Sequence, residues 1–80
     1  MIYVYAISSL IHNYIYVGQT DDVIRRFHEH NNGQEKTTRP YAPFELLNSW
    51  ECANRKSARY LEKYYKSSSG KRMLRKMRDR

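Results

Sequence analysis

The stretch YVYAISSLIHNYIYVGQT, from Tyr3 to Thr20, decides the fold of this 80-residue chain. Apolar and aromatic residues alternate with a period of two on either side of residues 8–13, where the serines and the His-Asn pair interrupt the pattern. Two short alternating runs with such a break are typical of two strands joined in a hairpin. The stretch also holds four tyrosines in two Tyr-x-Tyr pairs and no Lys or Arg.

The four tyrosines are expected to share one face of this hairpin. Tyr3 and Tyr5 alternate with aliphatic residues on the first strand, as Tyr14 and Tyr16 do on the second. With the connection centred near residues 10–11, Tyr5 falls opposite Tyr16. We expect the aliphatic face to be buried and the tyrosine face to be at least partly open. The alternative is that the phenols only pack, since aromatic cross-strand pairs stabilise a small sheet by a few tenths to about 1 kcal/mol each.

A helix is expected to follow the hairpin. Residues 23–31, VIRRFHEHN, place apolar side chains at helical spacing. Thr20 or Asp21 is suited to cap its start, and Gly33 is suited to the position just past its end. Residues 31–41 are expected to form a loop.

A third strand and two more helices complete the predicted domain. Alternation from Phe44 to Cys52 predicts a strand with strictly alternating faces. Asn54 is expected to cap a helix that ends near Ser67, and the run 67–70 separates it from a short last helix. In that last helix the residues expected to point inward are Met73, Leu74 and Met77, and those expected to point outward are Lys71, Arg72, Arg75, Lys76 and Arg78. The sequence thus predicts one α/β domain over residues 1–80, with a small three-stranded sheet flanked by helices in the order β-β-α-β-α-α.

Positive charge is concentrated in the last third of the chain. Residues 1–24 carry a net charge of −2, residues 25–54 are neutral, and residues 55–80 hold eleven Lys and Arg against two acids, a net charge of +9. Such a basic segment indicates a polyanionic partner, most often nucleic acid. A merely solubilising charged face is the alternative. Binding to a membrane surface is disfavoured because the apolar side of the segment is modest.

The composition also argues against several classes of protein. With Cys52 as its single cysteine, the chain has no internal disulfide and no structural zinc spacing. The apolar start of the chain is too short to span a bilayer and lacks the basic flank and cleavage site of a signal peptide. We therefore expect a cytoplasmic protein with no membrane association.

Three polar residues stand out as candidates for chemistry, although each also has an ordinary structural explanation. Arg26 is placed to pair with Asp22 one turn earlier, and His30 is placed to cap the end of its helix. Glu62 is placed to form salt bridges with basic neighbours on its own helix. Glu62 is nevertheless the only carboxylate in the basic stretch 55–78, which is an unusual place for a single acid.

The two Tyr-x-Tyr regions resemble the GIY-YIG nuclease superfamily, which is named for two tripeptides on a β-hairpin with a catalytic tyrosine in each. Residues 3–5, Tyr-Val-Tyr, correspond to the first tripeptide and residues 16–18, Tyr-Val-Gly, to the second. The spacing of eleven between Tyr5 and Tyr16 suits the family. The chain departs from the pattern in having Tyr3 in place of the first glycine and valine in place of both central isoleucines.

The resemblance extends over nearly the whole chain and is closest to the small stand-alone members. The family's catalytic arginine, ten residues after the second tyrosine, falls on Arg26, and the His or Tyr one turn later falls on His30. The family's metal-binding glutamate, four residues after a small residue, falls on Glu62, which follows Ala58 at that spacing.

The resemblance implies a divalent-metal-dependent endonuclease that hydrolyses DNA phosphodiester bonds by a one-metal mechanism. Glu62 would hold Mg²⁺ or Mn²⁺, and Tyr16 would accept the proton of the attacking water. Arg26 would bind the non-bridging phosphate oxygens, Tyr5 would position the water or the second phenol, and His30 would orient or share the proton.

The expected partner is DNA, including branched or damaged DNA, in repair or recombination, although RNA is not excluded and the oligomeric state is left open. The residues expected to bind its phosphates are Arg59, Lys63, Lys66, Lys71, Arg72, Arg75 and Lys76. No further DNA-binding domain lies within these 80 residues, so sequence-specific cleavage is not expected. Two alternatives are a non-catalytic nucleic-acid-binding module on the same fold and a basic adaptor for an acidic protein. The binding module has no need of Glu62, and the adaptor predicts no salt-sensitive binding of DNA.

Overall fold

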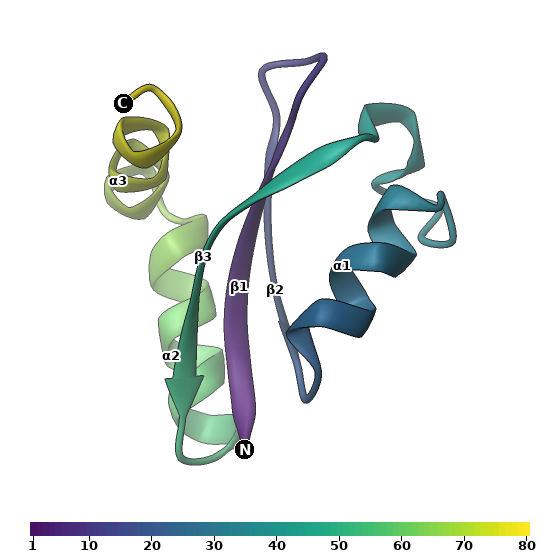
Figure 1. The fold of residues 1–80 in the computed structure, drawn as a ribbon. Helices are drawn as coiled ribbons and strands as arrows, with labels where there is room; N and C mark the ends of the chain where they lie inside the picture. Colours follow the sequence, from purple (N-terminus) through teal and green to yellow (C-terminus); the bar gives the residue numbers. More distant parts are fainter.

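The computed structural model describes all 80 residues and contains one antiparallel sheet with helices on both of its faces (Figure 1). The elements are β1 (Ile2–Ser9), β2 (Ile15–Thr20), α1 (Val23–Asn31), the 3₁₀ helix η1 (Arg39–Tyr41), β3 (Phe44–Cys52), α2 (Arg55–Lys66) and α3 (Ser68–Arg78). The strand order is β2-β1-β3, so the N-terminal strand is central and β2 is an edge. The predicted α/β fold and its element order are confirmed, with η1 added. No helix is long and apolar enough to cross a membrane.

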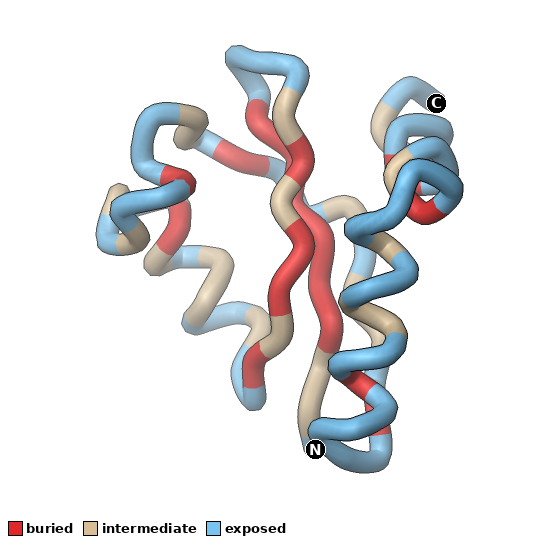
Figure 2. The backbone as a smooth tube through the Cα atoms, turned by 180° about the vertical axis from the view of Figure 1, so that it is seen from behind, coloured by how far each residue is buried: buried red, intermediate tan, exposed pale blue.

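The sheet buries both of its faces because successive side chains of a strand point in opposite directions. Val4 and Ala6 of β1 belong to a core closed by α2 and α3 through Ala58 and Leu74. The other face carries a smaller core formed by Tyr5, Ile7 and Phe44, against which α1 packs. Figure 2 shows the buried residues following the strands, while the helices are largely exposed. Almost all of β1 is therefore interior.

The hairpin register differs from the predicted one by two residues. Tyr5 pairs with Gly18, not with Tyr16, and the turn occupies residues 10–13. The Ser9 hydroxyl accepts two backbone N–H groups of this turn at 3.0 and 3.2 Å, which fixes the wider connection. Because a shift of two residues preserves the face of every side chain, Tyr5 and Tyr16 still lie on the same side of the sheet.

A β-bulge in β3 makes the predicted strict alternation of that strand wrong. The pairing between β1 and β3 shifts between Ala6 and Ile7, which leaves Leu47 without a partner in β1. One extra residue reverses the direction of all later side chains relative to the partner strand. As a result Phe44 belongs to the core under α1, whereas Cys52 belongs to the core under α2 and α3.

The first helix begins one or two residues later than its predicted caps. Asp22 is the N-cap, and its carboxylate accepts the backbone N–H of Arg25 at 3.1 Å. Thr20 instead accepts the backbone N–H of Asp22 at 3.1 Å and so stabilises the turn that leads into the helix. Gly33 follows the helix end with φ of 73°, as predicted for a residue that must adopt a left-handed conformation.

The last two helices are separated by a single residue. Asn54 caps α2 as predicted, and Ser67 caps α3 by accepting the backbone N–H of Gly70. The predicted break over residues 67–70 is therefore shorter than expected. Leu74 is fully buried as predicted, but Met73 is 46% exposed, because α3 meets the core along the side that carries Leu74.

Replacing Gly70 by alanine is expected to destabilise the protein. A Cβ at this position would overlap the backbone carbonyl of Tyr64 and would lie 2.5 Å from the Cα of Tyr65, so α2 and α3 would have to separate. We expect a loss of about 1–3 kcal/mol in the free energy of unfolding, although alanine is the better helix former. The exposed control Ser69→Ala is expected to change it by less than about 0.5 kcal/mol in urea denaturation. Equal midpoints for the two variants would contradict this close packing.

Candidate active site

A buried chain of hydrogen bonds joins the first strand to α1 and to the loop that follows it. The Tyr5 hydroxyl lies 2.8 Å from Nε2 of His30, and Nδ1 of His30 lies 2.7 Å from the Thr38 hydroxyl. Tyr5 is 1% exposed and the other two residues are fully buried. The expectation that the tyrosine face is partly open is therefore wrong at Tyr5, because α1 and this loop cover it.

The pKa values of Tyr5 and His30 determine which atoms carry the protons in this series of hydrogen bonds. Burial raises the pKa of Tyr5 to about 12, so the phenol keeps its proton at neutral pH. Burial, followed by the charge of Arg26, lowers the pKa of His30, so the imidazole is neutral. Tyr5 therefore donates to Nε2, and Nδ1–H donates to Thr38, whose hydroxyl in turn lies 3.5 Å from the backbone carbonyl of Glu35.

Gly18 provides the space that the two tyrosines need. It pairs with Tyr5 across the hairpin, and a Cβ at this position would lie 2.8 Å from the Tyr5 hydroxyl oxygen and 2.9 Å from Cε2 of Tyr16. Neither contact is possible for a real side chain without movement of a ring. The Tyr16 ring is centred 5.2 Å from the His30 ring and 6.2 Å from the Tyr5 ring, and it is only partly buried. The glycine thus brings both phenols and the imidazole into one cluster.

Arg26 stands beside this cluster and is held by two carboxylates. Its Nη1 lies 3.0 Å from Glu29 and its Nη2 lies 2.8 Å from Glu35. The hydrogen bond with Glu35 raises the pKa of Arg26, and the same bond lowers the pKa of Glu35. A hydrogen bond with Arg26 also acts on the pKa of Tyr5, although burial outweighs it. The expected pairing of Arg26 with Asp22 does not occur.

Three residues of this cluster were not predicted. Glu29 carried a weak signal, since it lies three residues after Arg26 on the same helix. Glu35 and Thr38 carried none, because they lie in the loop before η1, where no sequence pattern sets the backbone path.

Glu62 lies on the other side of the edge strand. Its carboxylate accepts a hydrogen bond from Gln19 at 2.7 Å and forms a salt bridge of 2.7 Å with Lys66. Burial alone would raise the pKa of Glu62, but the hydrogen bonds from Lys66 and Gln19 outweigh it and hold this pKa below its ordinary value. Arg55 donates to the amide oxygen of Gln19 at 3.1 Å and completes the group. Glu62 is therefore an oriented, ionised carboxylate.

The structure brings together four of the five predicted catalytic residues and leaves Glu62 apart from them. Gln19 follows Gly18 in β2, and neighbouring side chains of a strand point to opposite faces. The cluster with Tyr5 and Tyr16 consequently lies on the α1 side of β2, and Glu62 lies on the α2 side. No hydrogen bond or ion pair joins the two groups, although both flank the same edge strand.

Glu62 is the residue of this site that suits a divalent ion. The structure contains no group of three or more His, Cys, Asp or Glu side chains that could hold a metal. A structural zinc site takes four such ligands, whereas Mg²⁺ keeps several waters and needs only one or two protein carboxylates. An ionised carboxylate that is 19% exposed, paired with a lysine that is 51% exposed and free to move away, fits that requirement.

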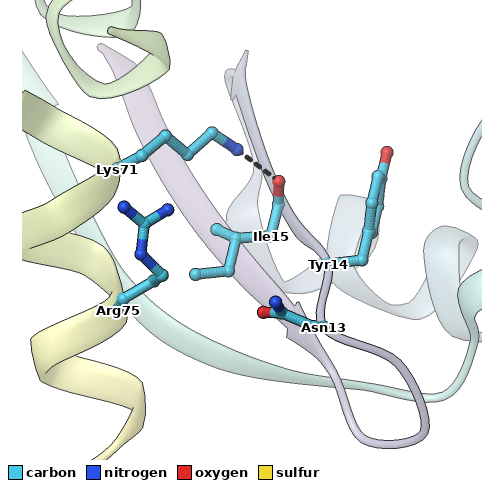
Figure 3. A pocket seen from close by; sticks show the side chains of 5 residues that line it. All are labelled: Asn13, Tyr14, Ile15, Lys71 and Arg75. Atoms are coloured by element: carbon cyan, nitrogen blue, oxygen red, sulfur yellow. Dashed lines mark hydrogen bonds between the residues drawn. The ribbon is translucent and has the colours of Figure 1, made fainter. Parts of the chain in front are cut away.

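The residues expected to bind DNA are mostly exposed. Those on the surface are Arg59, Lys63, Lys66, Arg72, Arg75 and Lys76. Lys71 differs, because it is half-buried and its ammonium group donates to the backbone carbonyl of Ile15 in the edge strand (Figure 3). Burial lowers the pKa of Lys71. The expectation that Lys71 points outward is therefore wrong: it satisfies a carbonyl group of a strand edge that would otherwise be free to pair.

The neutral state of His30 predicts that stability depends on pH. Because its pKa is lowered from the ordinary 6.5, the folded protein binds fewer protons than the unfolded chain. The stabilisation is present above pH 6.5 and is lost as the pH falls below it; Glu35 and Glu29 oppose this shift but do not cancel it. Urea midpoints of the wild type should decrease from about pH 7.5 to about pH 5. His30→Gln should flatten this dependence, whereas the exposed control His12→Gln should not. Equal slopes for all three proteins would contradict a buried neutral His30.

Comparisons with known proteins agree with this fold and with the two tripeptides. The family model of the GIY-YIG catalytic domain matches residues 1–77. The solution NMR structure of a UPF0213 protein from Bacillus halodurans is 32% identical, with a TM-score of 0.56, and the match covers 96% of this chain and 85% of that one. No curated protein matches the chain. Because the family model spans nearly the whole sequence and includes both tripeptides, the resemblance is confirmed, and this chain belongs to the GIY-YIG family.

Proposed function

We propose that this chain is a divalent-metal-dependent endonuclease that hydrolyses DNA phosphodiester bonds by a one-metal mechanism. Membership of the GIY-YIG family implies a nuclease, whose substrate is nucleic acid. The observation that carries the proposal is the arrangement beside β2. One phenol, Tyr5, is locked in its protonated form, a second, Tyr16, is partly open, and the guanidinium of Arg26 is held in place beside them.

The two phenols have different proton chemistry, which supports different roles. Tyr5 is buried, keeps its proton and donates a hydrogen bond to His30, so it is unsuited to act as a base near neutral pH. Tyr16 is partly exposed, and its hydroxyl makes no hydrogen bond within the chain. Tyr16 is therefore the phenol that remains free to contact an attacking water, while Tyr5 and His30 hold its ring in position. To accept a proton from that water, Tyr16 would first have to release its own hydroxyl proton to solvent and act as the phenolate.

Arg26 is suited to bind a non-bridging phosphate oxygen. Glu29 and Glu35 engage one terminal nitrogen each, and a guanidinium offers five N–H donors, so donors remain for a phosphate. The two carboxylates also fix the plane of the guanidinium before substrate arrives, which lowers the cost of ordering it. The negative charge of the two carboxylates partly opposes phosphate binding. Their contribution is therefore to orient the guanidinium, not to increase its affinity for the phosphate.

Glu62 would hold the Mg²⁺ or Mn²⁺ ion. When bound, the ion would supply positive charge at the phosphate and at the leaving oxygen. The chain's own contribution is to keep the carboxylate ionised and oriented through Gln19, and to release Lys66, whose side chain is 51% exposed. Exposed basic side chains of α2 and α3 would contact phosphates without reading bases. We propose branched or damaged DNA in the cytoplasm, in repair or recombination, as the substrate.

One observation favours a second candidate function, a non-catalytic nucleic-acid-binding module. Glu62 makes no hydrogen bond or ion pair with the tyrosine cluster and is paired with Lys66 instead. If that separation persists when nucleic acid is bound, the acid serves only as a salt-bridge partner and the protein binds without cutting. The two candidates differ in whether Glu62 is needed for cleavage.

Removing the charge of Glu62 is expected to abolish cleavage but not binding. Purified protein would be incubated with branched and linear DNAs in Mg²⁺ or in EDTA, and nicking would be followed on gels. Glu62→Gln should lose at least about 100-fold in rate, yet keep or improve its DNA affinity, since one negative charge leaves a basic face. The control Glu51→Gln replaces an exposed acid of β3 and should cut normally. Cutting by Glu62→Gln at the wild-type rate, or undiminished cutting in EDTA, would contradict the one-metal mechanism.

Comparing two tyrosine variants of the same strand region separates a chemical role from a packing role. Tyr16→Phe should lose about 10²–10⁴-fold in cleavage rate, as expected for loss of a general base. Tyr14→Phe removes the same hydroxyl two residues earlier, where the ring stacks on Tyr41 at 3.8 Å, and should retain most activity. Both variants should keep their DNA affinity within a few-fold. Similar losses in the two variants would return both tyrosines to a packing role.

A further inference from the structure

Two tyrosines of α2 are exposed on the helix surface, on the flank of its buried stripe. Tyr60 is 80% exposed and Tyr64 is 43% exposed. They are four residues apart and so are neighbours on the helix surface. With Lys63 and Ser67 they line a pocket that shares no residue with the cluster around His30. Neither ring has a part in the proposed cleavage chemistry.

The core does not account for these rings. The buried stripe of α2 consists of Ala58, Leu61 and Tyr65, and Tyr65 stacks on Trp50 with ring centres 4.3 Å apart. Tyr64 meets Tyr65 edge-on, at 5.0 Å and 77°, so the core supports its ring from behind. Tyr60 makes no aromatic contact within the chain. The result is a supported aromatic surface with free ring faces.

The charges around these rings indicate a polyanionic partner. At 3.6 residues per turn, the outer surface of α2 presents Glu62 first, then Arg59 and Lys66, then Lys63, and finally the tyrosines. Glu62 is the only acid of the helix and is already paired. A band of positive charge therefore leads from the proposed metal ligand to the aromatic surface. A protein partner would have to be unusually acidic to cover it, whereas nucleic acid supplies one negative charge per nucleotide.

We propose that Tyr60 and Tyr64 form a stacking platform for unpaired bases of a nucleic acid strand whose phosphates lie along Arg59 and Lys63. Every base has a π-face, so stacking tolerates any sequence, and positively charged grooves with aromatic rings are the usual means of binding single strands. Paired bases of a duplex already stack on one another and leave no face for a ring on a surface helix. The platform rests on the nucleic acid substrate of the proposed function, and it narrows that substrate to nucleic acids with unpaired nucleotides beside the cleavage site.

The platform is tested by comparing two oligonucleotides of equal charge. Fluorescence anisotropy in EDTA measures binding of a labelled 12-residue thymidine strand (about one binding site in length) and of an abasic strand with the same number of phosphates. The wild type should bind the strand with bases at least about tenfold more tightly. Tyr60→Ala/Tyr64→Ala should lose this preference while its affinity for the abasic strand stays the same. Tyr60→Phe/Tyr64→Phe keeps both rings and should keep the preference.

Two further variants separate stacking from charge. Arg59→Gln/Lys63→Gln should weaken binding of both strands equally and lower the salt slope by about 0.7 for each phosphate that is no longer neutralised. Tyr60→Ala alone, at a position 80% exposed, provides the test if the double alanine variant does not fold. Equal wild-type affinity for the two strands, or full preference in the alanine variants, would overturn the platform. A change in oligomeric state on size exclusion with no change in base preference would overturn it too, and would assign the rings to an interface between copies of this chain.

The same measurements distinguish the platform from the proposed nuclease. Binding in EDTA needs no metal and no cleavage. Preference for the strand with bases in a protein that never cuts would support the platform and overturn the nuclease. Cleavage by a protein without that preference would overturn only the platform.

Discussion

The hydrogen bond between the Tyr5 hydroxyl and Nε2 of His30 is the constraint on which the rest of the site depends. Both groups are buried, and a buried polar group left without a partner costs about 1–3 kcal/mol. The bond therefore ties the central strand to α1, and the second nitrogen of His30 extends the tie to Thr38 in the following loop. Burial of the bonded pair also sets the protonation of both partners, because it opposes the imidazolium and the phenolate alike. This hydrogen bond also requires Gly18, because a side chain at that position would displace the Tyr5 hydroxyl.

The charged groups of the candidate site are held by counter-charges that substrate or metal would partly replace in the proposed mechanism. Lys66 can move away from Glu62 because its own side chain is 51% exposed, while Gln19 keeps the carboxylate oriented. Arg26 is more tightly held, because two carboxylates engage it and about a quarter of its side chain is exposed. The arrangement favours a fixed guanidinium and a carboxylate that is easily freed. That asymmetry matches a mechanism in which Arg26 is ready before substrate arrives and the ion joins at Glu62.

Local patterns in the sequence were sufficient to predict the helices and strands. The features that they did not predict depend on packing between residues far apart in the sequence. Periodicity and the Asn54 cap, which act within a few residues, predicted α1, β3 and α2 to within one or two residues of their bounds. The two tripeptides and their spacing identified the family. The hairpin register and the bulge at Leu47 depend on contacts between strands, so alternation alone misplaced them. The burial of Tyr5 was missed because the loop that covers it has no pattern of its own.

The packing and catalytic explanations of the tyrosines apply to different atoms of the same side chains. A chain of this size buries only about 60% of its unfolded surface, so it has no apolar area to spare on either sheet face. The ring of Tyr5 is a core residue, while its hydroxyl sets the proton chemistry of the cluster. The Tyr14 ring stacks on Tyr41. Tyr16 packs against the same core but is only partly buried, and its hydroxyl makes no hydrogen bond within the chain. Small size is a reason for candidate catalytic residues to be aromatic, because a phenol contributes core area and a titratable group from a single position.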